Sequence, residues 1–361
     1  MKICFLCTEI FAWGKYGGFG RATRTIGREL VQRGIDVYAI VPRRVGQNEY
    51  EELDGIKVSG FKPYDLLAVI KYAKTIDADI YHSEEPSLIS VLAHIARPRK
   101  KHIVTFRDPR DSEDWYIEYK DHSLSKVQVL LNRIFENNFI IDRSLQKFDG
   151  LYCAAECLCE KSMRVYKLKE APVFLPTPVL LPNMIKKANT PTVCYLARLD
   201  RRKRPELFLQ LAEKFPHVRF LLAGTSRDKK WERYLVGKYR YLKNLEILGF
   251  IDQFNSDKVS ELLSQSWILV NTAVREGLPN AFIEALAHKC ALLSYVDPNE
   301  YASKYGYRAV GDDFDAGLRY LLENDRWRGL GDEGQREIAK TFEMNTALNA
   351  HIDIYQKLLA E

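Results

Sequence analysis

The sequence has few of the features that mark secreted, membrane-spanning or nucleic-acid-binding proteins. Its N-terminal apolar run ends at Thr8 and Glu9 and is too short for a signal peptide or a membrane span, so we expect a first β-strand there. The seven cysteines are an odd number without paired CxxC units, which favours reduced thiols in a cytosolic protein. The net charge of +6 in 361 residues is too mild and diffuse for nucleic acid, but it favours anionic ligands or an anionic membrane surface.

Short apolar runs separated by helix-length amphipathic stretches indicate an α/β fold. Neither internal repeats nor low-complexity segments are apparent. The first series of expected strands covers residues 3–7, 36–41, 56–61, 80–82, 102–106, 150–154 and 173–176. The second series covers residues 193–196, 219–223, 245–248, 268–271, 291–295 and 307–310. Each series predicts a parallel, doubly wound sheet.

The length of the chain and the break between the two series predict two domains. We expect an N-terminal Rossmann-like domain at residues 1–181, a linker at 182–190 and a C-terminal Rossmann-like domain at 191–343. Residues 344–361 are expected to form a final helix, for which packing back on the first domain is one of two options. Two facing domains of this class place a ligand cleft at the carboxyl ends of both sheets.

Two glutamates flank a Gly-Leu-Pro turn in the stretch VREGLPNAFIEALAHKCALL. Pro279 suits the first helical position, so Glu276 is expected ahead of a helix and Glu284 about one turn inside it. A loop carboxylate beside unpaired backbone N–H groups suits a phosphorylated, hydroxyl-rich ligand. A capped helix with solvated acids explains the same pattern.

The stretch YLARLDRRKRPELFLQLA places two cations between the first strand of the second series and a helix. Arg198 and Lys203 can both reach one diphosphate, where an arginine fork and a mobile lysine neutralise a leaving pyrophosphate group. Because Arg201, Arg202 and Arg204 complete a run of like charge, a solvated basic loop remains an alternative.

Three glycines, Gly17, Gly18 and Gly20, precede the first expected helix, where glycine lets the backbone approach a ligand closely. A dinucleotide-binding fingerprint is not supported, because Thr23 stands at the third glycine position and about nine residues separate the strand from Gly17. We therefore expect no nicotinamide cofactor. A flexible loop ahead of a helix is the alternative interpretation.

In combination, these segments resemble the retaining glycosyltransferases of family 4, which have the GT-B fold. The resemblance rests on the Gly-Gly loop, the RLDRRK stretch, the LGF sequence that ends at Phe250 and the E-x7-E pair, which occur in the family's order and spacing. It covers nearly the whole chain. It implies two Rossmann-like doubly wound domains that face each other across a cleft, the first binding the acceptor and the second a nucleotide sugar.

The resemblance also implies roles for individual residues. Arg198 and Lys203 match the R-x4-K positions that bind the donor diphosphate. Glu276 matches the glutamate that contacts the donor sugar, and Glu284 the one that contacts the ribose hydroxyls. Catalytic roles thus fall to Glu276, Arg198 and Lys203. The wider donor site is expected to include Gly249, Phe250, Gly277 and Leu278, and the acceptor side of the cleft Gly17, Gly18, Phe19, Arg107 and Asp108.

The implied activity is transfer of a sugar, with retention, from a nucleotide-diphosphate donor to a glycan, lipid-linked or small-molecule acceptor. The family has no assured protein nucleophile, so the protein supplies positioning and electrostatic stabilisation of the diphosphate. No cofactor or metal is expected. The sequence Asp77-Ala-Asp79 resembles the metal-binding D-x-D of other glycosyltransferases, but we interpret it as a strand-entry turn, with His82 packed rather than a ligand.

The chain departs from the family pattern in several places. Arg107 in TFRD stands where the family usually has a histidine; arginine cannot act as a base, but it can bind a phosphate, a carboxylate or sugar hydroxyls. The sequences PTP at residues 176–178 and KCALL at 289–293 replace two further family motifs. These departures keep two alternatives open, an inactive nucleotide-sugar-binding regulator and an epimerase or phosphorylase of the same fold.

Basic residues are numerous in the first expected domain. Arg21, Arg24 and Arg28 fall at helical spacings of three and four and are expected to form one basic face. A solvated surface explains this face. The alternative is weak, salt-sensitive docking on an anionic membrane without an evident apolar anchor. The expected location is therefore cytoplasmic, with peripheral association on the cytoplasmic membrane face as a hypothesis.

Overall fold

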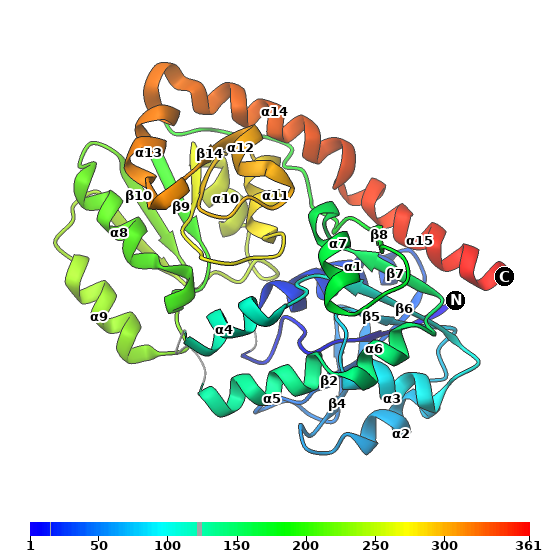
Figure 1. Ribbon diagram of the computed structural model, residues 1–361. Helices are drawn as coiled ribbons and strands as arrows, with labels where there is room; N and C mark the ends of the chain where they lie inside the picture. Colours follow the sequence, from blue (N-terminus) through cyan, green and yellow to red (C-terminus); the bar gives the residue numbers. More distant parts are fainter. Residues whose placement is uncertain (15, 121–124) are drawn as a thin grey trace. The chain divides into compact units, whose positions relative to one another are not determined.

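The structure is a computed structural model that describes residues 1–14, 16–120 and 125–361, and it divides by contact density into two units (Figure 1). The first unit contains Met1–Trp115, Val127–Pro178 and Met344–Glu361. The second unit contains Val179–Glu343 together with Tyr116–Lys126, a segment from the first half of the chain. The expected domain limits did not include this transfer of residues 116–126 to the second unit.

The first unit contains an eight-stranded sheet with the order β3-β4-β2-β1-β5-β6-β7-β8. Its strands are β1 (Lys2–Leu6), β2 (Asp36–Pro42), β3 (Tyr50–Leu53), β4 (Ile56–Phe61), β5 (Ile80–Ser83), β6 (Lys101–Phe106), β7 (Gly150–Cys153) and β8 (Val173–Phe174). All neighbours are parallel except β3 and β4. The seven expected strands are confirmed within a few residues, whereas the antiparallel edge strand β3 was not foreseen.

Helices cover both faces of this sheet. They are α1 (Gly18–Gln32), α2 (Leu67–Ile76), α3 (Leu88–Ala96), α5 (Lys126–Glu136), α6 (Phe139–Leu145), α7 (Cys159–Val165), α15 (Met344–Ala360) and the start of α4 (Ser112–Lys120), with a 3-10 turn at Glu156–Leu158. Alternate residues of β1 enter different cores: Ile3 and Phe5 pack in one cluster, and Cys4 and Leu6 in the other. Burial on both faces explains why the parallel strands read as continuous apolar runs.

The C-terminal helix α15 belongs to the first unit. Its Leu348, Tyr355 and Leu358 pack in the same core cluster as Ile3 and Phe5. Although about 340 residues separate β1 from α15 in sequence, this burial makes the end of the chain part of the first core. No helix in the described part of the chain is both long and apolar enough to cross a membrane.

The second unit contains a six-stranded parallel sheet with the order β11-β10-β9-β12-β13-β14. Its strands are β9 (Thr192–Leu196), β10 (Arg219–Ala223), β11 (Leu245–Gly249), β12 (Ile268–Asn271), β13 (Ala291–Ser294) and β14 (Gly306–Arg308). Its helices are α8 (Pro205–Lys214), α9 (Lys229–Tyr239), α10 (Lys258–Gln265), α11 (Asn280–Ala287), α12 (Tyr301–Tyr305), α13 (Phe314–Leu322) and α14 (Arg326–Thr341), with 3-10 turns at Arg201–Lys203, Pro298–Glu300, Val310–Asp312 and Glu323–Asp325. The six strands expected here are confirmed.

Two helix starts differ slightly from the expectation. Helix α1 begins at Gly18 with Gly17 as its N-cap, so that Gly18 and Gly20 lie in the first turn rather than ahead of it. Helix α11 begins at Asn280, and Pro279 occupies the N-cap with extended backbone instead of the first helical position. Both differences move the helix start by only one or a few residues.

Candidate functional site

The loop after β9 carries Arg198 and Lys203, and two buried hydroxyl groups fix its backbone. The Tyr195 hydroxyl donates to the carbonyl oxygen of Arg198 at 3.2 Å and lies 3.4 Å from that of Lys203. From the end of β12, Thr272 Oγ1 donates to the same Lys203 carbonyl at 2.5 Å. Because β9 and β12 are adjacent parallel strands, their following loops meet at one edge of the sheet.

The neighbouring arginines each have a partner of their own within the second unit. The Arg201 guanidinium stacks 4.1 Å from the centre of the Trp231 ring. Arg204 pairs with Asp312 at 2.7 Å, and its Nε donates to the carbonyl oxygen of Thr272 at 2.7 Å. The alternative of a solvated basic loop is therefore wrong for Arg204, whereas Arg201 stays exposed beside the Trp231 ring.

Lys203 and Glu276 form a direct ion pair in the second unit. Both side chains are largely buried, at 10% and 14% exposure. Burial lowers the pKa of Lys203, and the Glu276 carboxylate opposes this shift. Arg198 is more accessible and pairs with Asp200 at 3.2 Å. The structure thus brings together the three residues to which the sequence assigned catalysis.

Glycines shape the backbone around these loops. Gly249, at the end of β11, has φ +69°, and its carbonyl oxygen accepts from Gly224 N at 2.7 Å. Gly224 has φ +145°, and a Cβ there would lie 1.9 Å from the carbonyl oxygen of Ala197. Only glycine suits this position, which the sequence analysis missed although Gly224 directly follows β10. Phe250, expected at the donor site, is exposed.

Helix α11 and its preceding loop place the remaining donor-site candidates. Gly277 is buried and Leu278 half-buried in the loop after Glu276. Glu284 lies one turn inside α11, as expected, and is half-buried. Its carbonyl oxygen lies 2.7 Å from His288 Nδ1, which fixes the end of the helix.

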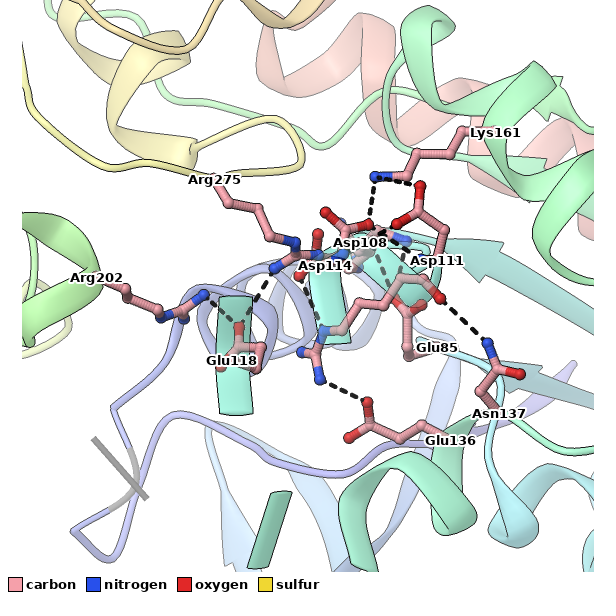
Figure 2. Close-up of polar contacts among 12 residues, drawn as sticks. Glu85, Asp108, Asp111, Asp114, Glu118, Glu136, Asn137, Lys161, Arg202 and Arg275 are labelled. Carbon is pink, nitrogen blue, oxygen red and sulfur yellow. Dashed lines mark hydrogen bonds and ion pairs between the residues drawn. The ribbon is translucent and has the colours of Figure 1, made fainter. Parts of the chain in front are cut away.

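Glu118 is a component of this region that the sequence analysis did not identify. It lies in the segment Tyr116–Lys126 of the second unit and accepts from Arg202 Nη1 at 2.7 Å and from Arg275 Nη1 at 3.4 Å (Figure 2). These arginines are the sequence neighbours of Lys203 and Glu276. One carboxylate therefore joins the two loops from which the ion pair comes. No motif spacing in the sequence indicates this role of Glu118, since it lies over eighty residues before Arg202.

In the first unit, the glycine-containing loop packs against a carboxylate of the same unit. Glu9 is buried, and its Oε1 accepts from Gly20 N at 3.3 Å. A Cβ on Gly17 would lie 1.8 Å from the same oxygen, so this contact requires glycine. Gly18 is exposed and Phe19 half-buried. The N-terminus of α1 is thus already next to a negative charge.

The basic face expected on α1 is wrong at its central residue. Arg24 is 7% exposed, and its guanidinium pairs with Asp54 at 2.6 Å and donates to the carbonyl oxygen of Phe11 at 2.8 Å. Arg28 lies 3.3 Å from Glu29. Helical spacing alone does not separate a solvated arginine from one whose partner comes from a distant loop.

Arg107 lies at the end of β6, where its guanidinium is held by groups of the first unit. Its Nε donates to Glu84 Oε2 at 2.6 Å and its Nη1 to Thr177 Oγ1 at 2.8 Å. The side chain is buried. The sequence analysis expected the guanidinium N–H groups of Arg107 to bind a phosphate, a carboxylate or sugar hydroxyls. In the structure these N–H groups already donate to Glu84 and Thr177.

Glu85 fixes the backbone at the start of the loop that follows β6 and contains Arg107. Its Oε2 accepts from the backbone N–H groups of Arg107 at 2.8 Å and Asp108 at 3.2 Å (Figure 2). Burial, with a smaller contribution from the Asp108 carboxylate, raises the pKa of Glu85 to about 8. Asp108 itself is half-buried, 3.4 Å from Arg110.

The interpretations of His82 and of the Asp77-Ala-Asp79 turn agree with the structure. His82 is fully buried, with Nδ1 2.7 Å from the Tyr355 hydroxyl and Nε2 2.8 Å from Thr105 Oγ1. Asp77 ends α2 in the left-handed region, and Asp79 accepts from the backbone N–H of Lys2 at 2.8 Å as β5 begins. Both acids are parts of a strand-entry turn.

Two family models match different parts of the chain. The model described as Glycosyl transferases group 1 matches residues 182–301, and the model described as Glycosyltransferase Family 4 matches residues 16–179. Together they cover more than half of the chain, which belongs to the group 1 glycosyltransferases of the family 4 type. No curated protein sequence matches the chain significantly.

Solved structures confirm the GT-B fold class. Sucrose-phosphate synthase from Thermosynechococcus elongatus is similar, with a TM-score of 0.77 and 15% identity over 99% of both chains. HepE of Anabaena, in complex with UDP and glucose, has a TM-score of 0.72 and 13% identity over 99% of both chains. TarM of S. aureus, whose complex includes UDP, has a TM-score of 0.70 and 12% identity, covering 98% of this chain and 100% of that one.

Proposed function

We propose that this glycosyltransferase moves a sugar, with retention, from a nucleotide-diphosphate donor to a hydroxyl-bearing acceptor. The observation that carries the proposal is the grouping of Arg198, Lys203 and Glu276 on adjacent loops at the carboxyl edge of the second sheet. Two cations and a carboxylate there suit a diphosphate and its attached sugar. The complexes of HepE and TarM with UDP support a UDP sugar as the first donor to test.

In the proposed reaction, the bond between the sugar C1 and the donor phosphate oxygen breaks. A bond between C1 and the acceptor oxygen forms on the same face, and the acceptor proton passes to the leaving phosphate oxygen. Arg198 and Lys203 stabilise the charge that builds on the diphosphate. Glu276 orients the sugar and Glu284 the ribose, and the fixed backbone of the two loops preorganises these contacts.

A panel of UDP, GDP and ADP sugars tests the proposal against its two alternatives. A transferase releases nucleotide slowly, and release accelerates when an acceptor is added. Binding without turnover would instead identify a regulator, and a rearranged donor would identify an epimerase. The anomeric configuration of the product, read by NMR, tests retention separately. The cysteine pattern supports a reducing compartment, and we propose that the enzyme acts in the cytoplasm.

Transfer is expected to survive chelation by EDTA. Asp77 of the D-x-D lookalike pairs with Arg97 at 3.2 Å, and among the residues that the structure describes no group of three His, Cys, Asp or Glu side chains is placed to hold a metal. Initial rates with and without EDTA provide the measurement, with added Mn²⁺ or Mg²⁺ as the reference. A strict requirement for either ion would contradict the prediction.

Substitution of the two glutamates is expected to give different kinetic defects. Glu276→Gln should mainly lower kcat, by about tenfold or more, because its carboxylate contacts the reacting sugar. Glu284→Gln should mainly raise the donor KM, by about tenfold, because it loses a contact to the ribose. The matched control is Glu300→Gln on the exposed surface of the same unit, which should change neither constant. Identical defects in both variants would refute the division of roles.

A further inference from the structure

Helix α5 presents an apolar face to the surface. Val127, Leu130, Leu131 and Ile134 recur at spacings of three and four, and all are more than half exposed. The opposite face is anchored, since Val129 is buried and Phe135 packs against a core cluster of the first unit. Contiguous exposed apolar side chains of this size are uncommon on soluble proteins and mark an interaction surface.

Helix α6 extends this face. Phe139 is 74% exposed and Ile140 47%, whereas Ile141 and Leu145 on the other side of α6 are buried. The corner between the helices is held by Asn138, which caps α6 by accepting from the N–H of Ile140 at 2.9 Å and donates to the carbonyl oxygen of Ile134 at 2.6 Å. The two helices follow one another in Figure 1. We call the six exposed apolar residues the α5–α6 face.

The charges around the α5–α6 face are positive. The exposed cations on these helices and just after them are Lys126, Arg133, Arg143 and Lys147, and none forms an ion pair with another described residue. The two acids of the same stretch are neutralised. Glu136 pairs with Arg110 at 2.9 Å and Asp142 with Lys167 at 3.1 Å.

We propose that the α5–α6 face docks on an anionic lipid bilayer. An amphipathic helix with apolar residues on one side and cations beside them buries its apolar side chains at the acyl boundary while its cations meet lipid phosphates. A second copy of the chain fits less well, because its own cations would face those of the first copy. This surface differs from the α1 face predicted from the sequence, where Arg24 is buried, and it supplies the apolar anchor that the sequence analysis did not find.

Vesicle co-sedimentation tests the docking with the full-length protein. Vesicles of phosphatidylcholine alone are compared with vesicles that also contain phosphatidylglycerol, at low and high salt. We expect binding that needs phosphatidylglycerol and weakens with salt. The double variant Leu130→Ser/Leu131→Ser should bind at least about tenfold more weakly. Lys126→Glu/Arg133→Glu should lose the preference for the anionic lipid.

Matched controls separate this face from general effects. Tyr64 and Leu67 are at least as exposed in the same unit, so Tyr64→Ser/Leu67→Ser should bind as the wild type does. Arg21→Glu/Arg28→Glu on α1 should also retain binding. Circular dichroism melting confirms that each variant folds. In addition, the fluorescence of the tryptophan introduced by Leu131→Trp should be quenched by vesicles with brominated lipid chains.

Three results would overturn the proposal. The first is equal recovery of the wild type in the supernatant with both vesicle types at low salt. The second is loss of binding in the α1 variant but not in the α5 variants. The third is a concentration-dependent dimer in sedimentation velocity that Leu130→Ser/Leu131→Ser dissociates, which would show that a second copy covers the face.

Discussion

Replacing Lys203 with alanine is expected to lower kcat/KM for the nucleotide-sugar donor by about two orders of magnitude or more. Each stabilised phosphate contact is worth roughly 3 kcal/mol in the transition state, and the Lys203 side chain is largely shielded from water. Arg198→Ala should have an effect of similar size. Its side chain is about one-third exposed, and among the described residues it pairs only with Asp200, so the fold should tolerate the change.

The control for both variants lies in the same loop. Arg201→Ala removes an equally basic side chain that stacks on Trp231, and it should keep kcat/KM within a few-fold of the wild type. Initial rates at limiting donor give the comparison, and thermal melting reports any loss of fold. Full activity in both Arg198→Ala and Lys203→Ala would remove the diphosphate assignment.

Acidification is expected to destabilise the first unit strongly. Burial lowers the pKa values of His82 and His351 to about 3 and of His102 to about 4. These histidines stay neutral in the folded state while the unfolded chain binds protons near pH 6.5. Their contribution is thus present above pH 6.5 and is lost as the pH falls towards 3 or 4. From pH 7 to pH 5 the three histidines lower the free energy of unfolding by about 5–6 kcal/mol.

Glu85 acts in the opposite direction. Its pKa is raised from 4.5 to about 8, so its contribution to stability is complete below pH 4.5 and is lost as the pH rises through 8. As the pH falls from 7 to 5, Glu85 raises the free energy of unfolding by about 2–3 kcal/mol. The net loss from the histidines and Glu85 together is therefore roughly 3 kcal/mol. That loss is a large part of the stability of an ordinary domain.

Urea unfolding at several pH values between 5 and 8 measures this dependence. His351→Gln should reduce the net loss of unfolding free energy between pH 7 and pH 5 by about 2 kcal/mol, which is more than half of that loss, since one of three protonations disappears. The matched control is His217→Gln, at an exposed position in the second unit, which should leave the slope unchanged. A wild-type profile that is flat from pH 7 to pH 5 would be the contrary result.

Local patterns predicted the parts of the fold that depend on local sequence. Strands such as β5 and β12 are buried on both faces, and their apolar runs stand out between amphipathic stretches. The edge strand β3 (Tyr50–Leu53) alternates between exposed and half-buried residues and has no apolar run to reveal it. The loops with Arg198, Lys203 and Glu276 were located correctly because they follow strands.

The parts that failed depend on partners far away in sequence. Arg24 was expected in solvent, but Asp54 reaches it from a turn thirty residues later. Likewise, Glu118 gives no local signal of its contacts to Arg202 and Arg275. Helix α5, on which the sequence analysis made no prediction, shows the same limit: a helical apolar period is typical of a core-facing stripe, and only the three-dimensional packing shows which side remains exposed.

The ion pair between Lys203 and Glu276 gives the lysine a counter-ion within the protein itself. An isolated buried ammonium tends to lose its proton, and the carboxylate keeps Lys203 charged before any substrate arrives. Under the proposed function, donor binding is therefore an exchange: the diphosphate takes over Lys203, and Glu276 is released to meet the sugar hydroxyls. This single ion pair then couples binding of the donor diphosphate to the availability of Glu276 for the donor sugar.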